Sequence, residues 1–296
     1  MAAIKVENLK KYFGNIKAVD DISIEVERGI LFGFLGPNGA GKTTTIRCMM
    51  DFIRPTKGAI TILGKDARRD SVELKSKIGY LSGNVHLYDQ WDGKTHIDFI
   101  KRFYNGRDNS ASLVSRFGLD TGKKAKHLSS GNRQKLSLIL TFMTEPEILI
   151  LDEPTLGLDP LLQNEVYELL YESAENGSTV FMSSHNLAEV ERVCSQVGII
   201  KKGKMVASQS IAALKEKKIN IINAQFGQPV NPEDFLDDNT ELVKEFTDGL
   251  LLKVRGDINP AIQKLGKYNL AHIEISQPSL EDIFMEYYSN SEGNHA

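Results

Sequence analysis

The sequence predicts an α/β fold with a mostly parallel central sheet, an antiparallel N-terminal sheet, a helical subdomain and a small α+β C-terminal appendage. Three patterns predict it. The apolar run ILFGFLG (30–36) leads through a glycine-rich segment into TTTIRCMMDFI, which is the order of a strand, a loop and a helix. The apolar runs EILILDEP (147–154) and STVFMSSH (178–185) do not alternate, so we expect parallel strands buried on both faces. Residues 1–30 alternate apolar and polar positions, as antiparallel strands with one solvated face do.

The remaining segments complete this fold in chain order. Residues 86–127 are rich in polar side chains and predict helices, and the helical subdomain extends to about residue 144. Breaks in it are expected at Gly93, Gly106, Gly118 and Gly122. The segment LQNEVYELLYESAEN has apolar residues at helical spacing and predicts a helix between two buried strands. We expect one domain over residues 1–216 and an accessory domain over 217–296, with strand candidates INIINAQF, GLLLKV and HIEIS, two helix candidates and no chemical motif.

Composition and charge exclude several classes of protein. A length of 296 residues suggests about two domains, and a net charge of −3 gives no electrostatic basis for binding nucleic acid. Cys48 and Cys194 are too few for a disulfide framework or a four-thiolate metal site, so we expect buried, reduced thiols in the cytoplasm. The most apolar runs, 30–36 and 136–143, are far shorter than the roughly 18 residues that cross a bilayer. We therefore expect no membrane pore within this chain.

The segment GPNGAGKTT (36–44) matches the phosphate-loop pattern G-x-x-x-x-G-K-[ST]. Its glycines let consecutive backbone N–H groups surround phosphate oxygens, and the helix that follows adds the positive end of its dipole. Lys42 is placed to reach the β- and γ-phosphates of a nucleotide, and Thr43 to bind Mg²⁺ through its hydroxyl. The predicted nucleotide-binding residues of this loop are Gly36, Pro37, Asn38, Gly39, Ala40, Gly41, Lys42, Thr43 and Thr44.

Two acids end the buried strand ILILD. Asp152 stands at the carboxyl end of the strand, where it is placed to hold Mg²⁺ through water. Glu153 follows it and is the candidate to polarise the attacking water. Adjacent strand residues point to opposite faces, but that pattern relaxes where a strand ends, so both acids can face one site.

With three further motifs, these segments resemble the ATP-binding cassette (ABC) family over about residues 3–215. The motifs occur in the family's order: GPNGAGKTT, LSSGN (128–132), ILILDEPT (148–155), GLD (157–159) and SSH (183–185). Five ordered motifs are far more specific than the phosphate loop alone, and no guanine-reading NKxD follows. The resemblance implies a P-loop NTPase cassette that binds ATP with Mg²⁺ and hydrolyses the nucleotide.

The resemblance also implies roles for residues outside the phosphate loop. Phe13 resembles the aromatic residue on which adenine stacks, with Tyr12 and a plain core role for Phe13 as alternatives. LSSGN resembles the family's LSGGQ, so Ser129 and Gly131 would contact the γ-phosphate bound to the opposite protomer. His185 resembles the switch histidine that holds the γ-phosphate and positions the water. The implied assembly is a head-to-tail homodimer, or a pair with a homologous cassette, in which both composite sites need both chains.

Two segments depart from the family pattern. In IGYLSGN, Gly83 stands where the family usually has a glutamine, so no magnesium or relay role transfers to it, and the neighbouring Asn84 is a partial substitute at best. Ser130 and Asn132 replace a glycine and a glutamine of LSGGQ, which would lower turnover without abolishing it. Asp159 resembles the residue through which the two sites communicate.

Transport is the leading functional reading: an ATPase subunit on the cytoplasmic face of the cell membrane, driving a separate transmembrane permease. The alternative is a soluble ABC ATPase that acts on ribosomes or DNA, but those proteins have two cassettes or a long coiled coil, and this chain has neither. A P-loop kinase is disfavoured by LSSGN and SSH. The ending QPSLEDIFMEYY (277–288) resembles the closing segment of drug- and antibiotic-exporter ATPases, which favours export. Within it Leu280, Ile283, Phe284 and Tyr287 have helical spacing, for packing within the appendage or against the cassette or partner chain.

Overall fold

The computed structural model describes residues 2–104, 107–215 and 219–276. The chain divides into two compact units, Met1–Ser208 and Gln209–Ala296, and each has a hydrophobic core of its own.

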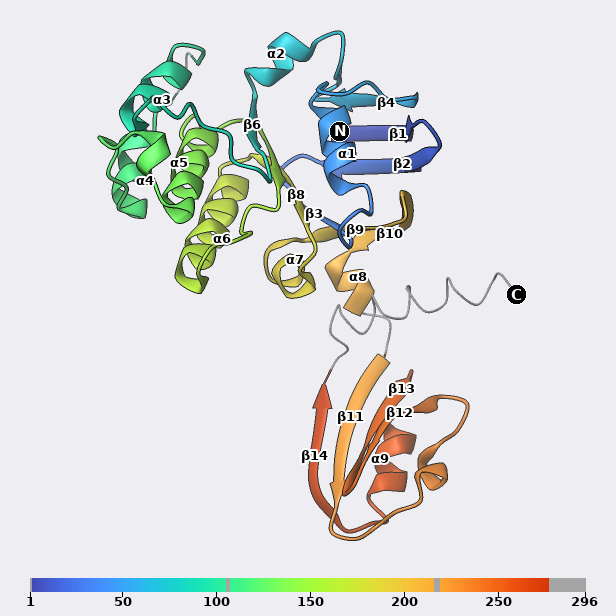
Figure 1. The fold of residues 1–296 in the computed structure, drawn as a ribbon. Coiled ribbons are helices and arrows are strands. Elements are labelled where there is room, and N and C mark those ends of the chain that lie inside the picture. The colour runs from blue at the N-terminus through green and yellow to red at the C-terminus, as the bar shows by residue number, and fades with distance from the viewer. Residues whose placement is uncertain (1, 105–106, 216–218, 277–296) are drawn as a thin grey trace. The chain divides into compact units, whose positions relative to one another are not determined.

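The centre of the first unit is a six-stranded sheet in the order β10-β9-β3-β8-β7-β6 (Figure 1). The five strands from β9 to β6 pair in parallel, which confirms the parallel strands that the apolar runs predicted at β3, β7 and β8. Every residue of β3, β7 and β8 is buried, because helices or a second sheet cover both faces. The bounds are β3 Leu31–Leu35, β6 Ile78–Leu81, β7 Ile148–Asp152, β8 Thr179–Ser184, β9 Gln196–Lys201 and β10 Lys204–Ser210.

A four-stranded sheet in the order β2-β1-β4-β5 contains the N-terminal segment. Its strands pair antiparallel, and burial alternates along the second half of β2, which confirms the pattern expected for residues 1–30. The bounds are β1 Ala2–Phe13, β2 Ile16–Glu27, β4 Lys57–Ile62 and β5 Lys65–Asp66.

Helix α1 (Lys42–Met49) lies between the two sheets of this unit. Its buried Ile46 and Met49 belong to one core with Phe32 and Phe34 of β3 and with Ile22 of β2. Burying side chains of this size stabilises the fold by about 1.5–3 kcal/mol each. The packing fixes where α1 begins, and therefore where the loop that precedes it stands.

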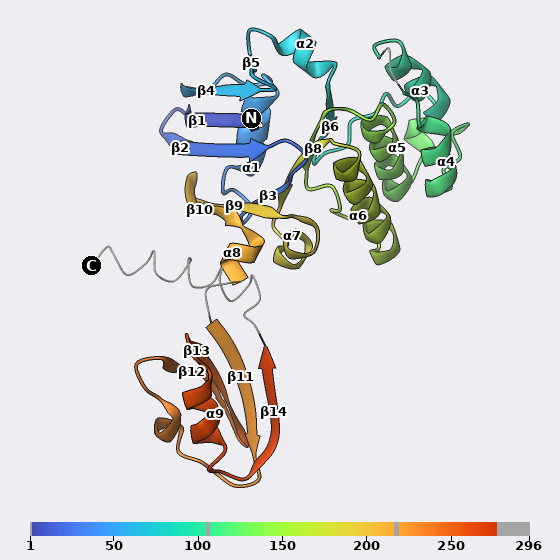
Figure 2. The ribbon, with the colours of Figure 1, turned by 180° about the vertical axis from the view of Figure 1, so that it is seen from behind.

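Helices α3, α4 and α5 form the predicted helical subdomain, whereas α6 and α7 lie outside its predicted range and pack on strands of the central sheet. Helices α3, α4 and α5 gather beside α6, away from the antiparallel sheet (Figures 1 and 2). Asp92 caps α3 by accepting a 2.7 Å hydrogen bond from the backbone N–H of Thr95, and Gly118 ends α4 at a φ of 56°. The predicted break at Gly93 is the first residue of α3, Gly122 lies in a turn, and Gly106 lies outside the described residues. The bounds are α2 Ser71–Lys75, α3 Gly93–Lys101, α4 Ser110–Phe117, η1 Ala125–His127, α5 Ser130–Phe142, α6 Pro160–Glu175 and α7 Leu187–Val193. The next helix, α8 Ile211–Lys215, belongs to the second unit.

Both cysteines are buried free thiols, as expected. Burial raises the pKa of Cys48 to about 11, so the thiol stays protonated at neutral pH. Within the described ranges, no helix combines the length and the apolar character that crossing a bilayer requires.

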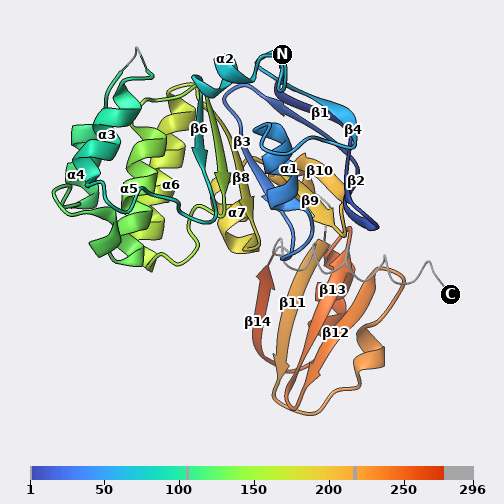
Figure 3. The ribbon, with the colours of Figure 1, turned by 45° about the horizontal axis from the view of Figure 1, so that its top comes forward.

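The second unit has an antiparallel four-stranded sheet in the order β12-β13-β11-β14 (Figure 3). Phe235 of η2 and Leu265 of α9 pack with Leu252 of β13 in its core, giving the expected α+β arrangement. The strand β12 was not among the predicted strands, because four of its seven residues are charged or hydroxylated and it lies at the sheet edge. The predicted helix around Leu280 lies outside the described residues. The bounds are β11 Ile219–Phe226, η2 Pro232–Phe235, β12 Thr240–Phe246, β13 Gly249–Arg255, α9 Asn259–Leu265 and β14 Leu270–Ser276.

Candidate nucleotide site

The glycine-rich segment forms the loop between β3 and α1. Gly41 precedes the first residue of α1 at a φ of 113°, and a Cβ there would stand 2.5 Å from the carbonyl oxygen of Ala18. A Cβ on Gly36 would stand equally close, at 2.5 Å, to the carbonyl oxygen of Ile200. The tight curl of the loop therefore depends on both glycines, and it places the start of α1 at the open end of a cavity.

That cavity has a volume of about 190 Å³. Its lining consists of loop residues, one residue of β2 and one acid that follows β7: Ala18, Pro37, Asn38, Gly39, Gly41, Lys42, Thr43, Thr44 and Glu153. Seven of the nine predicted phosphate-loop residues thus surround one space with the predicted base. The other two, Gly36 and Ala40, are buried behind it.

Lys42 is the buried cation of this cavity, with only 6% of its side chain exposed. Its Nζ donates hydrogen bonds to the carbonyl oxygens of Gly36 at 2.6 Å and Pro37 at 3.3 Å, and pairs with Glu153 Oε1 at 3.1 Å. A lysine is rarely this buried unless it is paired, so the loop and one carboxylate hold the ammonium group in place.

Glu153 joins the phosphate loop to the end of β8. Its Oε2 lies 2.7 Å from His185 Nδ1, while Oε1 pairs with Lys42. Its backbone has a φ of 53°, in the left-handed region that residues with a side chain seldom adopt. The left-handed conformation ends the alternation of side chains along the strand directly after Asp152. Backbone strain of this kind is concentrated at functional sites.

Asp152 is 3% exposed, and its environment fits a hard cation. Ser183 Oγ donates a 2.6 Å hydrogen bond to Oδ1, and the same hydroxyl accepts one from the backbone N–H of Glu153 at 3.1 Å. Thr43 offers an exposed hydroxyl on the phosphate loop. Carboxylate and hydroxyl oxygens suit Mg²⁺, which keeps several water ligands. In the described part of the chain, no three His, Cys, Asp or Glu side chains form a cluster that could hold a metal ion.

Ser183 is a site residue that sequence reasoning did not single out. It is the register partner of Asp152 across the parallel pair β7 and β8, so its hydroxyl and the carboxylate share one face. The sequence signal that could have indicated Ser183 was the alternation of side chains along the strand that contains SSH. The register between the two strands, however, cannot be predicted from either segment alone.

The aromatic candidates differ in their surroundings. Phe13 ends β1 and is 48% exposed, with Lys11 Nζ 4.6 Å from its ring centre. The hydroxyl of Tyr12 instead donates a 2.5 Å hydrogen bond to Asp20. Phe13 is therefore half-exposed and is not a core residue.

Ser129, Gly131 and Asp159 lie apart from this group. Ser129 caps α5 by accepting a hydrogen bond from Asn132 N–H at 3.3 Å, and a Cβ on Gly131 would meet open space. Asp159 caps α6 by accepting one from Leu162 N–H at 3.0 Å. In the described part of the chain, no hydrogen bond or ion pair joins these three residues to the cavity.

Gly83, the departure from the family pattern, stands beside Asp152. A Cβ on Gly83 would lie 3.4 Å from Asp152 Oδ2, so a longer side chain at this position would contact the carboxylate directly. Asn84 is exposed. The position is therefore adjacent to the acid, but glycine supplies no ligand there.

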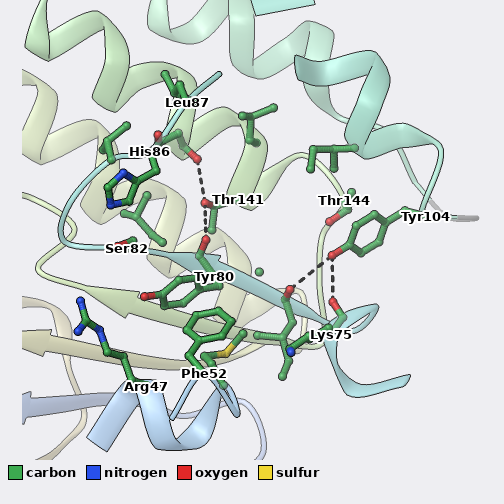
Figure 4. Close-up of a pocket in the computed structure, with 18 residues that line it drawn as sticks. Arg47, Phe52, Lys75, Tyr80, Ser82, His86, Leu87, Tyr104, Thr141 and Thr144 are labelled. Atoms are coloured by element: carbon green, nitrogen blue, oxygen red, sulfur yellow. Dashed lines mark hydrogen bonds between the residues drawn. The ribbon is translucent and has the colours of Figure 1, made fainter. Parts of the chain in front are cut away.

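A larger cavity of about 560 Å³ lies where β6 meets α1, α3 and α5 (Figure 4). The half-exposed Phe52 contacts Tyr80 edge-on with ring centres 5.3 Å apart, and Lys75 Nζ lies 5.4 Å from the Phe52 ring. Tyr104 OH donates a 3.1 Å hydrogen bond to the carbonyl oxygen of Lys75. No residue of the phosphate cavity lines this groove, so it is a separate surface of the first unit.

A phosphate loop on a parallel sheet, with a carboxylate held between a lysine and a histidine, defines a nucleotide-hydrolysing P-loop protein. Residues 19–156 match the family model described as ABC transporter. The daunorubicin resistance ATP-binding protein DrrA3 of Streptomyces coeruleorubidus is 30% identical over 302 residues, which cover 96% of this chain and 95% of that protein. The chain therefore belongs to the ABC transporter family, as an ATP-binding and ATP-hydrolysing subunit.

Further relatives agree with this assignment. The bacitracin transport ATP-binding protein BcrA of Bacillus licheniformis is 31% identical over 295 residues, 96% of each chain. A solved structure described as the ATP-binding subunit of an ABC transporter superposes with a TM-score of 0.68 at 27% identity, covering 72% of this chain and 92% of the other. A subunit of this class dimerises and works with a transmembrane partner, so the protein is membrane-associated.

Proposed function

We propose that two copies of this chain, or one copy and a homologous cassette, hydrolyse ATP at shared sites to drive a separate permease that exports drug- or antibiotic-like molecules. The names of DrrA3 and BcrA support this cargo class. The observation that carries the catalytic part is the Glu153 carboxylate, fixed between Lys42 at 3.1 Å and His185 at 2.7 Å.

In this proposal Glu153 is the general base. Its side chain is 14% exposed, and two neighbours, Lys42 and His185, fix the orientation of its carboxylate. It accepts the proton of the attacking water, while Lys42 offsets the charge of the β- and γ-phosphates. His185 is 45% exposed and stands at the cavity's edge, where it orients the base and reaches the γ-phosphate.

Mg²⁺ is proposed to be held by the Thr43 hydroxyl and, through water, by Asp152. When bound, the ion neutralises charge on the phosphate oxygens. Adenine stacks on Phe13, and Ser129 and Gly131 of the opposite copy complete the site from the far side of the nucleotide. The exposed cap of α5 supports this arrangement, because an N-terminal helix end attracts phosphate.

The permease is proposed to contact the groove lined by Phe52, Tyr80 and Tyr104 on the cytoplasmic side of the membrane. The groove is larger than the nucleotide cavity, three aromatic side chains are among its lining, and it shares no lining residue with that cavity. Phe52→Ala should reduce co-purification with the permease and leave basal ATP turnover unchanged. Val72→Ala is the control, because Val72 is 86% exposed and does not line the groove. Equal co-purification of both variants would place the contact elsewhere.

Glu153→Gln tests the base. The amide has the shape of the carboxylate but cannot accept the proton, so the variant should bind ATP, stop hydrolysing it and remain as an ATP-bound dimer. Turnover near the wild-type rate would remove Glu153 from this role. Lys42→Ala should instead weaken ATP binding, and unchanged affinity would contradict the role of the loop.

Mixing two inactive variants tests the shared sites. A dimer of one Ser129→Arg chain and one Glu153→Gln chain has one site with both lesions and one site with neither. Partial activity should therefore return, and turnover of the unmodified chain should rise more steeply than linearly with its concentration. Absence of recovery in dimers shown to be mixed would oppose the composite-site arrangement.

A further inference from the structure

Glu189 is a buried carboxylate that the proposed mechanism leaves without a role. It lies on the short helix α7, is 3% exposed, and does not line the nucleotide cavity. In the described part of the chain the only other carboxylate buried to this degree is Asp152. No lysine, arginine or histidine of the described residues forms an ion pair with Glu189, and burial raises its pKa.

Each oxygen of Glu189 holds a different segment of the active region. Oε1 accepts a 2.6 Å hydrogen bond from the hydroxyl of Thr155, which lies two residues beyond the base Glu153. Oε2 accepts a 2.5 Å hydrogen bond from the hydroxyl of Ser184, the residue directly before His185. The carboxylate thus bridges the segment that carries the base and the segment that carries the histidine.

The bridge also extends to both neighbouring loops. The carbonyl oxygen of Ser184 accepts a 3.2 Å hydrogen bond from Gly36 N–H, at the start of the phosphate loop. The carbonyl oxygen of Thr155 accepts one from Leu158 N–H at 3.1 Å, in the turn that leads to Asp159. A displacement of either end of the bridge would therefore move segments that form the site.

Burying a carboxylate without a cation is unfavourable, and an apolar side chain of similar size would pack here at a lower cost. An apolar residue, however, cannot accept two hydrogen bonds at a fixed separation. We propose that Glu189 is a positioning residue for hydrolysis: it sets the spacing between Glu153 and His185 by holding Thr155 and Ser184. The inference rests on the proposed roles of Glu153 and His185.

The test compares two substitutions at this position in the full-length chain. Glu189→Ala removes both acceptors, so kcat for ATP should fall by about 10- to 100-fold, the usual effect of a small misplacement of reacting groups. The KM for ATP should stay within about threefold, because Lys42 and the phosphate loop are untouched. Glu189→Gln should restore most of kcat, since its amide can accept from one hydroxyl and donate to the other.

Two further variants separate positioning from general destabilisation. Thr155→Val keeps the side chain's shape and removes one end of the bridge, so it should lower kcat at unchanged KM even where Glu189→Ala fails to fold. Thr179→Val is the control: Thr179 is also buried (1% exposed, against 8% for Thr155), begins β8 at the end opposite Ser184, and accepts a 3.0 Å hydrogen bond from Gly29 N–H through its hydroxyl. That variant should lose stability and keep kcat.

Wild-type kcat in Thr155→Val, or in a folded Glu189→Ala, would overturn the inference. So would equal losses of kcat in Thr155→Val and Thr179→Val, because that result indicates destabilisation alone. If Glu153→Gln stops turnover in the same assay while the bridge variants do not lower it, only the bridge is wrong. If Glu153→Gln retains turnover, the proposed base itself is wrong.

Discussion

Ser183→Ala should lower the free energy of unfolding more than the same substitution at an ordinary buried serine, because the Ser183 hydroxyl donates a hydrogen bond to a charged group. Ser183 is fully buried, and its Oγ donates to Asp152 Oδ1 at 2.6 Å. A hydrogen bond to a charged group contributes about 1.5–3 kcal/mol. The substitution also removes the 3.1 Å hydrogen bond from the backbone N–H of Glu153 to the Ser183 hydroxyl. That N–H keeps its 3.2 Å hydrogen bond to the carbonyl oxygen of Ser183, so no donor is left without an acceptor. The expected loss of unfolding free energy is therefore about 1.5–3 kcal/mol.

The matched control is Ser178→Ala, directly before the same strand. Ser178 is 7% exposed, and its hydroxyl donates to the neutral carbonyl oxygen of Pro146 at 2.7 Å. A bond between neutral groups contributes about 0.5–1.5 kcal/mol, so this variant should be destabilised less. Urea denaturation followed by the fluorescence of Trp91, the single tryptophan, reports on the first unit of the full-length chain.

The two serines should also differ in ATP turnover. Ser183→Ala loosens both acids at the end of β7, so kcat should fall by about tenfold, whereas Ser178→Ala should leave it unchanged. Equal losses of stability in the two variants, together with unchanged turnover in Ser183→Ala, would refute the view that this hydroxyl holds the acidic pair.

Three other perturbations test separate parts of the molecule. Arg116 joins α4 to α6 through ion pairs of 2.7 and 2.8 Å with two glutamates, so Arg116→Ala should lower stability by about 1 kcal/mol, measured by urea denaturation, while the 81% exposed Arg107 should contribute little. Lys264 holds the pKa of Asp237 at about 2, below its ordinary 3.8, so the second unit should lose stability as the pH falls from about 4 to about 2. Lys264→Met should flatten that loss, as read from amide hydrogen exchange across 219–276; an unchanged pH profile would contradict the pairing. Deleting residues 217–296 should leave ATP binding near normal and weaken dimer formation or coupling to the permease, and lost nucleotide affinity in a folded product would place the tail at the ATP site.

The parts of the fold that could be predicted from the sequence are those whose signal is local. GPNGAGKTT contains its own strand, turn and helix context, and the runs around Leu149 and Phe181 are apolar because two layers cover them. Strands β4 and β12 were missed, since short strands with charged residues look like loops until a neighbouring strand pairs with them.

Contacts between segments were beyond sequence reasoning for a different reason. The hydroxyl of Ser183 reaches Asp152 only because β7 and β8 pair in one register. Glu189 reaches Thr155 and Ser184 only because α7 turns back over the ends of both strands. The left-handed backbone conformation of Glu153 could not be predicted from the residue type either, because a glutamate indicates a carboxylate and not a positive φ.

The left-handed backbone of Glu153 has a consequence for attempts to engineer a more stable protein. With its φ of 53°, Glu153 occupies a conformation that glycine adopts freely and that costs other residues about 1–3 kcal/mol. Glu153→Gly would relieve this strain and would also remove a carboxylate from beside Lys42, where the remaining ammonium group would be left uncompensated. Substitutions of Glu153 would therefore have opposing effects in a screen for heat tolerance alone, and any heat-tolerant variant altered at this position would have lost the proposed general base. Screens of this protein need turnover as a second criterion.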